Sequence, residues 1–225
     1  MDLIVFDLDG TLLNKASVIS DYTRETLCLL RDRDIAYTVA TGRTLHASRK
    51  LLHGQNFTLP HIYKNGVMIW HPLQEDYSHK YMLSEHELAT VLQVFVEQGV
   101  TPFIFTLTQD NQHAAYHATV QSEVEVRFVE ELSMNRELPL FPVSDLPAQA
   151  QITNISALGP RAAIDQVTAS VAQEEHLVAY RGAGMPNTDI QWLDIHHSEG
   201  SKGAAVGQLK QRLGVSRVIC FGDSD

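Results

Sequence analysis

Cysteine is scarce in this chain, with only two among its 225 residues. Cys28 and Cys220 cannot build a disulfide framework or a four-cysteine zinc site. Cys28 lies in a predicted helix and Cys220 in an apolar run, and free cysteine is among the residues most often buried. We therefore expect both to be small core residues of a protein kept in a reducing compartment.

Positive charge and long apolar runs are also in short supply. Lysine and arginine number 17 against 27 aspartates and glutamates, which gives a formal net charge of −10. This balance argues against a surface for nucleic acid or anionic membranes, although a small site in an acidic protein can still be locally positive. No apolar stretch approaches a membrane span, and no signal peptide precedes the first predicted strand. We expect a cytoplasmic protein without nucleic-acid or membrane partners, and its oligomeric state is left open.

What the chain does have is an alternation of strands and helices at both ends. Apolar runs alternate with helical patterns over about the first 70 residues, and the same rhythm returns past about residue 188. The predicted strands of these two parts are 2–6, 35–40, 61–63, 67–70, 190–195 and 217–221, and the predicted helices are 20–33, 44–52 and 201–213. This order predicts a parallel sheet flanked by helices.

The middle of the chain follows another pattern. A capping box of Ser84 with Glu87 opens a helix that Gly99 closes. Further on, the predicted strands are 102–108, 124–129, 151–158 and 177–180, with a helix near 160–174. The strict alternation in the second of these runs favours a strand with one wet face. We predict an α/β fold in which a Rossmann-like core, residues 1–80 and 188–225, carries an inserted α+β domain of residues 81–187.

Two acids stand at the end of the first predicted strand. Asp7 and Asp9 directly follow an apolar run, where carboxylates are costly unless something uses their charge. Alternate side chains of a strand point the same way, so the two acids can converge on one point. Gly10 lets the backbone turn sharply just beyond them.

Other polar residues are placed to join this pair. Thr41 and Gly42 follow the second predicted strand, and Asp223 follows the last one. Ligands of open parallel sheets bind at the carboxyl ends of the strands, so these groups should meet at one site. Lys202, near the start of a predicted helix, is well placed to reach the same point.

These residue types suffice for phosphoryl transfer. One carboxylate can attack phosphorus and form an acyl phosphate, and a second carboxylic acid can protonate the leaving alcohol and later deprotonate water. Magnesium prefers oxygen ligands and keeps several waters, so two or three carboxylates suffice to hold it. The Thr41 hydroxyl, backbone N–H groups and the Lys202 ammonium can hold the phosphoryl oxygens.

The set of motifs resembles the haloacid dehalogenase (HAD) superfamily of phosphatases, specifically the Cof-like branch with a large α+β cap domain. The matching segments are Asp7-Leu8-Asp9-Gly10-Thr11, Thr41-Gly42-Arg43, Ser201-Lys202-Gly203, Gly222-Asp223-Ser224-Asp225 and the turn Asn65-Gly66. Each short motif is weak evidence alone, but four in this order, at strand ends and a helix start, are strong. The likeness covers both ends of the chain well and the inserted domain only in its position and rhythm.

The resemblance implies a magnesium-dependent phosphatase for small phosphate monoesters, such as sugar phosphates or related metabolites. Asp7 would be the nucleophile that forms an aspartyl-phosphate, and Asp9 the general acid/base. Magnesium would be held by the Asp7 carboxylate, the backbone carbonyl of Asp9 and Asp223. The residues implied to bind the phosphoryl group are Thr41, Gly42 and Lys202, with Arg43 in contact with the substrate.

One departure from the family pattern concerns the fourth motif. The family normally continues with a further Asn and Asp, a strand and at least one helix, whereas this sequence stops at Asp225. We expect the C-terminal part of the core to be missing, from a protein about 40–50 residues longer whose sheet edge would be covered. For the chain as given, weak metal binding and poor activity are expected.

Other functions are compatible with parts of the pattern. A phosphomutase would use the same chemistry, and a non-catalytic ligand-binding protein could use the same scaffold. A phosphorylated receiver-like signalling module fits poorly, because receivers place the acceptor aspartate after a middle strand and lack a large insertion. His196-His197 is the only adjacent histidine pair, and it lacks the cysteines or helical spacing of a zinc site.

Overall fold

The computed structural model describes residues 2–108, 110–135 and 138–223. It divides into two compact units, the first made of Met1–Lys80 with Glu199–Asp225 and the second of Tyr81–Ser198. The predicted boundary between residues 187 and 188 is wrong. Strand β11 (Ile190–His197), which the sequence analysis gave to the core, pairs instead with β9 and β10 of the second unit.

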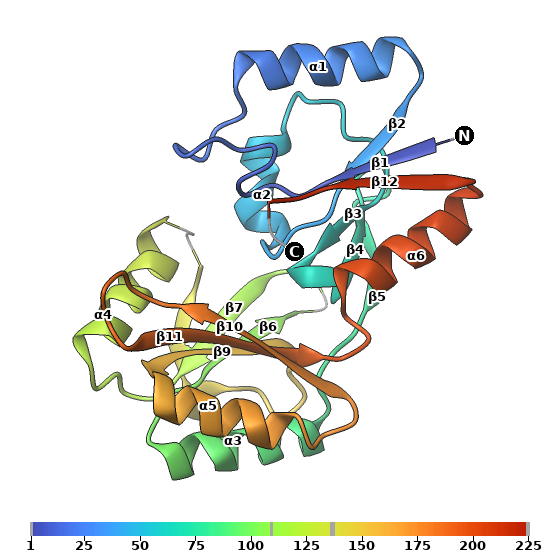
Figure 1. Cartoon of the computed structure of the whole chain (residues 1–225). Coiled ribbons are helices and arrows are strands. Elements are labelled where there is room, and N and C mark those ends of the chain that lie inside the picture. The colour runs from blue at the N-terminus through green and yellow to red at the C-terminus, as the bar shows by residue number, and fades with distance from the viewer. Residues whose placement is uncertain (1, 109, 136–137, 224–225) are drawn as a thin grey trace. The chain divides into compact units, whose positions relative to one another are not determined.

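The first unit is built on a parallel sheet, as predicted (Figure 1). Its strands are β1 (Asp2–Phe6), β2 (Ala36–Val39) and β12 (Arg217–Phe221), in the order β12-β1-β2. The two ends of the chain therefore lie side by side in one sheet. A parallel bridge between Ala40 and Ile62 links β2 to a second, antiparallel sheet of β3 (His61–Tyr63), β4 (Met68–His71) and β5 (Asp76–Lys80).

Alternation along β1 divides the interior of the first unit into two hydrophobic cores. Leu3 and Val5 belong to a core that includes residues of helix α6 (Lys202–Leu213). Ile4 and Phe6 pack against the other core, which includes residues of α1 (Asp21–Asp32) and α2 (Leu45–Leu52). Because side chains alternate along a strand, Asp7 continues the face that α6 covers.

The helices of the first unit begin where the sequence places capping residues. Ser20, Thr44 and Ser201 each accept a hydrogen bond from a backbone N–H in the first turn of α1, α2 and α6. Such caps satisfy backbone donors that have no partner within the helix. Gly214 ends α6 in a left-handed conformation, φ 62°, which glycine adopts without steric cost. The cap at Ser201 fixes the first residue of α6, Lys202.

The second unit is an α+β domain with a six-stranded sheet in the order β10-β11-β9-β6-β7-β8. The remaining strands are β6 (Phe103–Leu107), β7 (His113–His117), β8 (Leu140–Pro142), β9 (Gln151–Pro160) and β10 (Leu177–Ala183). All neighbours in the sheet are antiparallel except β7 and β8. Helices α3 (Glu85–Gln98) and α5 (Arg161–Val171) share one hydrophobic core with the sheet.

The predicted strand 124–129 is wrong, because this segment is helix α4 (Glu123–Glu130). Ser122 accepts from the Glu125 backbone N–H at 3.2 Å, and the Glu125 carboxylate accepts from the Ser122 N–H at 2.9 Å. This reciprocal capping box starts a helix and outweighs the two-residue alternation of apolar residues. A single π-helical turn, Glu131–Asn135, follows it, and Phe128 packs against a small hydrophobic core that includes Phe103 of β6.

Both cysteines are exposed, so the prediction that they are buried is wrong. Cys28 follows the buried Leu27 in α1 and points away from the core, and Cys220 lies on the sheet-edge strand β12. In the part of the chain that the structure describes, no helix combines the length and apolar character needed to cross a bilayer.

Candidate active site at the carboxyl end of the parallel sheet

Asp7 and Lys202 form an ion pair although 195 residues separate them in the sequence. The Lys202 Nζ donates to Asp7 Oδ2 at 2.6 Å, and the two side chains are 37% and 16% exposed, respectively. The other Asp7 oxygen, Oδ1, accepts from the Leu8 N–H at 2.7 Å. The Asp7 N–H itself donates to the Phe221 carbonyl at 2.9 Å, so β12 fixes the backbone that carries this carboxylate.

A cavity of about 550 Å³ opens beside this pair. Its described lining comprises Val5, Asp7, Ala40, Lys202, Gly203, Val206, Cys220, Phe221 and Gly222. The lining thus draws on the ends of β1 and β12, the residue after β2, and the first two turns of α6. The volume is in the range of small-molecule sites, and its two charged side chains are the predicted nucleophile and the predicted phosphate-binding lysine.

Thr41 and Gly42 lie in a loop next to the turn that follows β3. Thr41 is fully buried, and its hydroxyl oxygen accepts from the Arg43 N–H at 3.1 Å. Its carbonyl accepts from the Asn65 N–H at 3.0 Å. A Cβ on Gly42 would lie 3.0 Å from Asn65 Oδ1, so the two loops approach closely at this glycine. Neither residue belongs to the described lining of the cavity.

Asp9 pairs with an arginine, in contrast to the lysine partner of Asp7. Arg43 Nε donates to Asp9 Oδ2 at 2.8 Å and Arg43 Nη2 donates to Asp9 Oδ1 at 2.6 Å. This two-point arrangement matches the planar guanidinium to the planar carboxylate. The hydrogen bond to Asp9 raises the pKa of Arg43 above its usual range, against the effect of partial burial.

Asp223 lies against the turn that follows the two N-terminal acids. Gly10 has φ 70°, and a Cβ there would lie 2.2 Å from Asp223 Oδ2. A glycine is therefore required both by the backbone conformation and by the carboxylate that occupies the space. Of the fourth motif, Ser224 and Asp225 lie outside the described residues.

The predicted magnesium ligands are all hard oxygen donors. Within the described ranges, no group of three or more His, Cys, Asp or Glu side chains is gathered closely enough to hold a metal ion. The prediction requires only two carboxylates, Asp7 and Asp223, because the third ligand is the backbone carbonyl of Asp9. The Asp223 side chain lies against Gly10, the residue that follows Asp9 in the chain. Magnesium retains several waters in such sites. The donor set therefore suits magnesium.

Gly66 connects this site to the start of α6. It has φ 102°, and a Cβ there would lie 2.2 Å from the Ser201 carbonyl oxygen and 3.0 Å from the Lys202 nitrogen. The turn at residues 64–66 thus supports the backbone that carries Lys202. The sequence pattern marked Asn65-Gly66 only as a turn, and the contact with Ser201 was not predictable from it.

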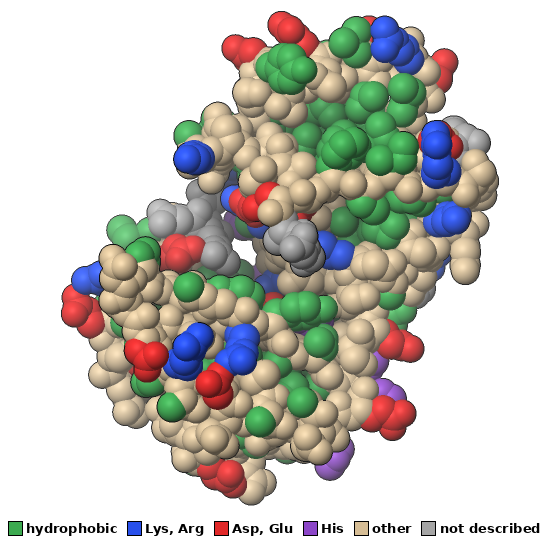
Figure 2. All heavy atoms as spheres, viewed as in Figure 1, with side chains coloured by type: hydrophobic (Ala, Val, Ile, Leu, Met, Phe, Trp, Pro, Cys, Tyr) green, Lys and Arg blue, Asp and Glu red, His purple; other side chains and the backbone are tan. Residues whose placement is uncertain are grey.

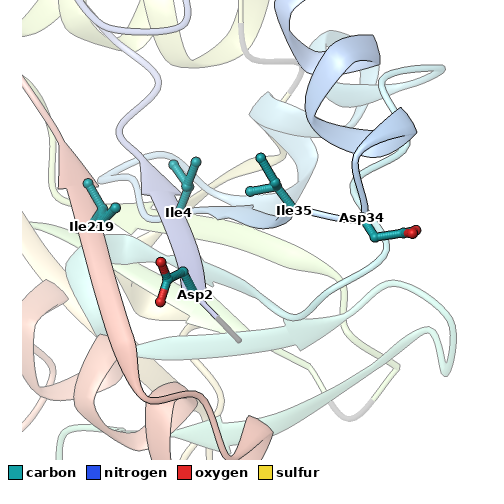
Figure 3. Close-up of a pocket in the computed structure, with 5 residues that line it drawn as sticks. All are labelled: Asp2, Ile4, Asp34, Ile35 and Ile219. Atoms are coloured by element: carbon teal, nitrogen blue, oxygen red, sulfur yellow. The ribbon is translucent and has the colours of Figure 1, made fainter.

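A second hollow of the first unit, of about 490 Å³, lies at the other end of the sheet (Figure 3). Ile4, Ile35 and Ile219 point to the same side in this view, with Asp2 and Asp34 beside them. Hydrophobic side chains gather on the same face of the first unit in Figure 2. Asp2 is bound by Arg217, and that hydrogen bond lowers the pKa of the Asp2 carboxyl. Among the described residues that line this hollow, no carboxylate is paired with a lysine as Asp7 is with Lys202 in the first cavity.

The structure places five of the predicted site residues in close contacts. Asp7 is bound to Lys202, Asp9 to Arg43, and Asp223 lies against Gly10. The sequence analysis did not predict the pairing of Arg43 with Asp9. It also missed the cavity-lining role of Phe221 and Cys220, which their position just before Gly222 could have indicated.

Comparison with known proteins also indicates a hydrolase of the haloacid dehalogenase type. A family model described as haloacid dehalogenase-like hydrolase matches residues 4–225. The chain is 23% identical over 236 residues to the Bacillus subtilis (strain 168) protein named "Putative phosphatase YxeH", a match covering 99% of this chain and 80% of that protein.

Solved structures show the same fold. A haloacid dehalogenase-like hydrolase from Bacteroides thetaiotaomicron matches with a TM-score of 0.76 and 18% identity, over 99% of this chain and 81% of that one. A structure described as the HAD subclass IIB sugar phosphatase BT4131 matches with a TM-score of 0.74 and 15% identity, over 100% and 81% of the two chains.

Proposed function

The chain belongs to the haloacid dehalogenase-like hydrolase family, and from this premise we propose that it is a magnesium-dependent phosphatase. Its substrates would be small phosphate monoesters, either sugar phosphates or related metabolites. A neighbour of similar fold is described as a sugar phosphatase, which supports this substrate class. The observation that carries the proposal is the 2.6 Å contact between Lys202 Nζ and Asp7 Oδ2 beside a cavity at the carboxyl end of the parallel sheet.

In the first half of the proposed reaction, an Asp7 carboxylate oxygen attacks phosphorus. The bond from phosphorus to the leaving alcohol oxygen breaks, and Asp9 gives that oxygen a proton. Lys202 holds the phosphoryl oxygens and restrains the charge of Asp7, with Thr41 and Gly42 as further phosphoryl ligands.

In the second half, water attacks the aspartyl-phosphate on Asp7. Asp9, now ionised, takes a proton from this water, and the bond between phosphorus and the Asp7 oxygen breaks. Inorganic phosphate leaves, and both acids return to their starting protonation states. Magnesium would be held by Asp7, the Asp9 carbonyl and Asp223, and when bound it supplies positive charge against the phosphoryl oxygens.

The test is an assay of phosphate release from a panel of monoesters with magnesium, comparing the parent chain with Asp7→Asn. Asp32→Asn is a matched control, because Asp32 is an exposed aspartate of α1 that also pairs with a cation, Arg31. We expect slow but measurable turnover by the parent and the control, in line with the poor activity expected of the chain as given, and none by Asp7→Asn. Acid quenching during turnover should trap a phosphorylated parent protein, detected by mass spectrometry.

Each alternative function has its own signature in this assay. Activity retained by Asp7→Asn would refute the covalent mechanism. Conversion of a monoester into a phosphorylated isomer would indicate a phosphomutase. An absence of turnover across the whole panel, with binding of a monoester by the parent chain, would indicate a non-catalytic binding protein.

A further inference from the structure

The two acids after β1 are held by different cations that come from different elements. Lys202, in the first turn of α6, makes one contact with Asp7. Arg43, between β2 and α2, makes two parallel contacts with Asp9, one to each carboxylate oxygen. Arg43 and Asp9 are 26% and 57% exposed, so the pair borders solvent.

The backbone of Arg43 is fixed on both sides. Its N–H donates to the Thr41 hydroxyl oxygen at 3.1 Å, and its carbonyl accepts from the Lys64 N–H at 3.0 Å. Lys64 and Asn65 both have positive φ, 48° and 53°, in a turn that a third hydrogen bond ties to Thr41. The guanidinium therefore extends from an anchored point, as a group that must orient another side chain requires.

The geometry leaves Arg43 poorly placed as a phosphate ligand. Its Nε and Nη2 edge, one of the two edges with which a guanidinium can bind a phosphate group at two points, already lies on Asp9. Arg43 is also outside the described lining of the cavity that contains Asp7 and Lys202. A guanidinium bound in this way fixes the orientation of the carboxylate that accepts its hydrogen bonds.

We propose that Arg43 is a positioning residue that works through Asp9, and not a ligand of the substrate phosphate. This inference rests on the proposed function, in which Asp9 is the general acid/base. A bidentate guanidinium fixes the plane of the Asp9 carboxyl group. That orientation matters in the second half-reaction, when Asp9 accepts a proton from the water that attacks the aspartyl-phosphate.

A specific kinetic pattern follows. Without Arg43, Asp9 loses its fixed orientation. For a substrate whose leaving group needs little protonation, hydrolysis of the aspartyl-phosphate then slows more than its formation, so the phosphorylated enzyme accumulates. General acid–base catalysis contributes roughly 10²–10⁴-fold, and a carboxylate with lost orientation forfeits part of it, about tenfold or more in kcat. KM should stay the same or fall, because the slow step then lies after the alcohol has left.

The test compares the parent chain, Arg43→Gln and Arg43→Lys with p-nitrophenyl phosphate and magnesium. This substrate has a leaving group that needs little protonation, so the first half-reaction is insensitive to Asp9. We expect a burst of p-nitrophenol and a reduced kcat in Arg43→Gln. Arg43→Lys keeps the positive charge but loses the two parallel N–H donors, so its kcat should be little higher than that of Arg43→Gln. Arg31→Gln, which removes another paired arginine of the first unit, should leave turnover unchanged.

A double-mutant comparison separates this role from simple substrate binding. In an Asp9→Asn background, Arg43→Gln should cause no further loss in kcat, because the group it positions is gone. A raised KM with unchanged kcat, or an equal fold loss in both backgrounds, would overturn the inference while leaving the phosphatase proposal intact. No turnover by the parent chain would refute the phosphatase proposal, and this inference with it. If Arg43→Gln fails to fold, as judged by circular dichroism, Arg43→Lys carries the same comparison.

Discussion

Gly66 offers a sharp test of how the site is supported, because the residue is remote from the chemistry yet contacts the backbone of Lys202. A Gly66→Ala substitution introduces a Cβ 2.2 Å from the Ser201 carbonyl oxygen and 2.4 Å from its carbon. These are backbone atoms, so no side-chain rotation relieves the clash. Ser201 must move, and Lys202 moves with it.

The expected magnitude has two parts. A left-handed backbone costs a residue with a side chain about 1–2 kcal/mol. Apolar atoms pack at about 3.5–4.0 Å, so the Ser201 backbone must shift by roughly 1 Å, and overpacking of this kind costs about 1–3 kcal/mol more. Misplacement of a catalytic group by about 1 Å can cost roughly 100-fold in rate.

Gly54→Ala is the matched control for Gly66→Ala. Gly54 also has a positive φ, 77°, but a Cβ there would meet nothing within 4 Å. The control therefore contains the backbone strain without the clash. The difference in unfolding free energy between the two variants should be about 1–3 kcal/mol, and only Gly66→Ala should lose activity.

The assay is urea unfolding followed by tryptophan fluorescence, in a Trp192→Phe background. The chain has two tryptophans, and Trp192 lies in the second unit, so the remaining Trp70 reports on the first unit. Phosphate release is measured on the same samples. Equal stability and equal turnover in the Gly66 and Gly54 variants would refute the reasoning that Gly66 supports Lys202.

Three further predictions concern other residues of the first unit. Burial lowers the pKa of His61 to about 4, so the unfolded state binds the proton more readily than the folded state. The contribution of His61 to the free energy of unfolding is therefore fully present above about pH 6.5 and falls by about 2 kcal/mol between pH 7 and pH 5. Urea unfolding at these two pH values should show a smaller fall in His61→Gln. Asp223→Asn should weaken magnesium binding by about tenfold or more in calorimetric titrations, and an unchanged affinity would remove Asp223 from the metal site. Lys202→Met should lower kcat/KM by roughly 10²–10³-fold without unfolding the protein, and a smaller loss than tenfold would contradict its placement at the phosphoryl group.

Local signals predicted the helices of this chain well, except where two signals competed. The Ser84–Glu87 capping box predicted α3, and Gly99 ends it in the left-handed conformation expected. At residues 124–129 the apolar alternation suggested a strand, but Ser122 and Glu125 form the same kind of capping box and the segment is helical. The box is a set of specific hydrogen bonds, whereas alternation over six residues also occurs by chance in a short amphipathic helix.

The pairing of strands that are distant along the chain could not be predicted from the sequence. The strand pattern at 190–195 was recognised, but nothing in it specifies whether β11 joins the parallel sheet or pairs with β9 and β10. Cys220 was expected in the core because its run is apolar, yet β12 is an edge strand of the described sheet and leaves it exposed. Both outcomes depend on contacts that are remote along the chain.

The candidate site shows the same limit at the level of side chains. The order of the motifs predicted that Asp7 and Lys202 would meet, because strand ends and helix starts converge in a parallel sheet. The Arg43–Asp9 pair depends on the loop at Thr41 and on a turn in which non-glycine residues have positive φ. Asparagine adopts positive φ readily and the turn at Asn65-Gly66 was predicted, but Lys64 has no such local preference, so the partner of Arg43 could not be predicted.

The charges of the site give a reason for the metal that is independent of family membership. Asp7, Asp9 and Asp223 are three carboxylates, and the cations that contact the first two are Lys202 and Arg43. When all three acids are ionised, these five side chains carry one net negative charge, and a phosphate dianion brought among them would be repelled. A divalent cation held by the proposed ligands Asp7 and Asp223 would reverse the sign of that local charge. In the proposed mechanism, phosphate affinity would therefore depend on the metal, and Arg43 would orient Asp9 whether or not the metal is bound.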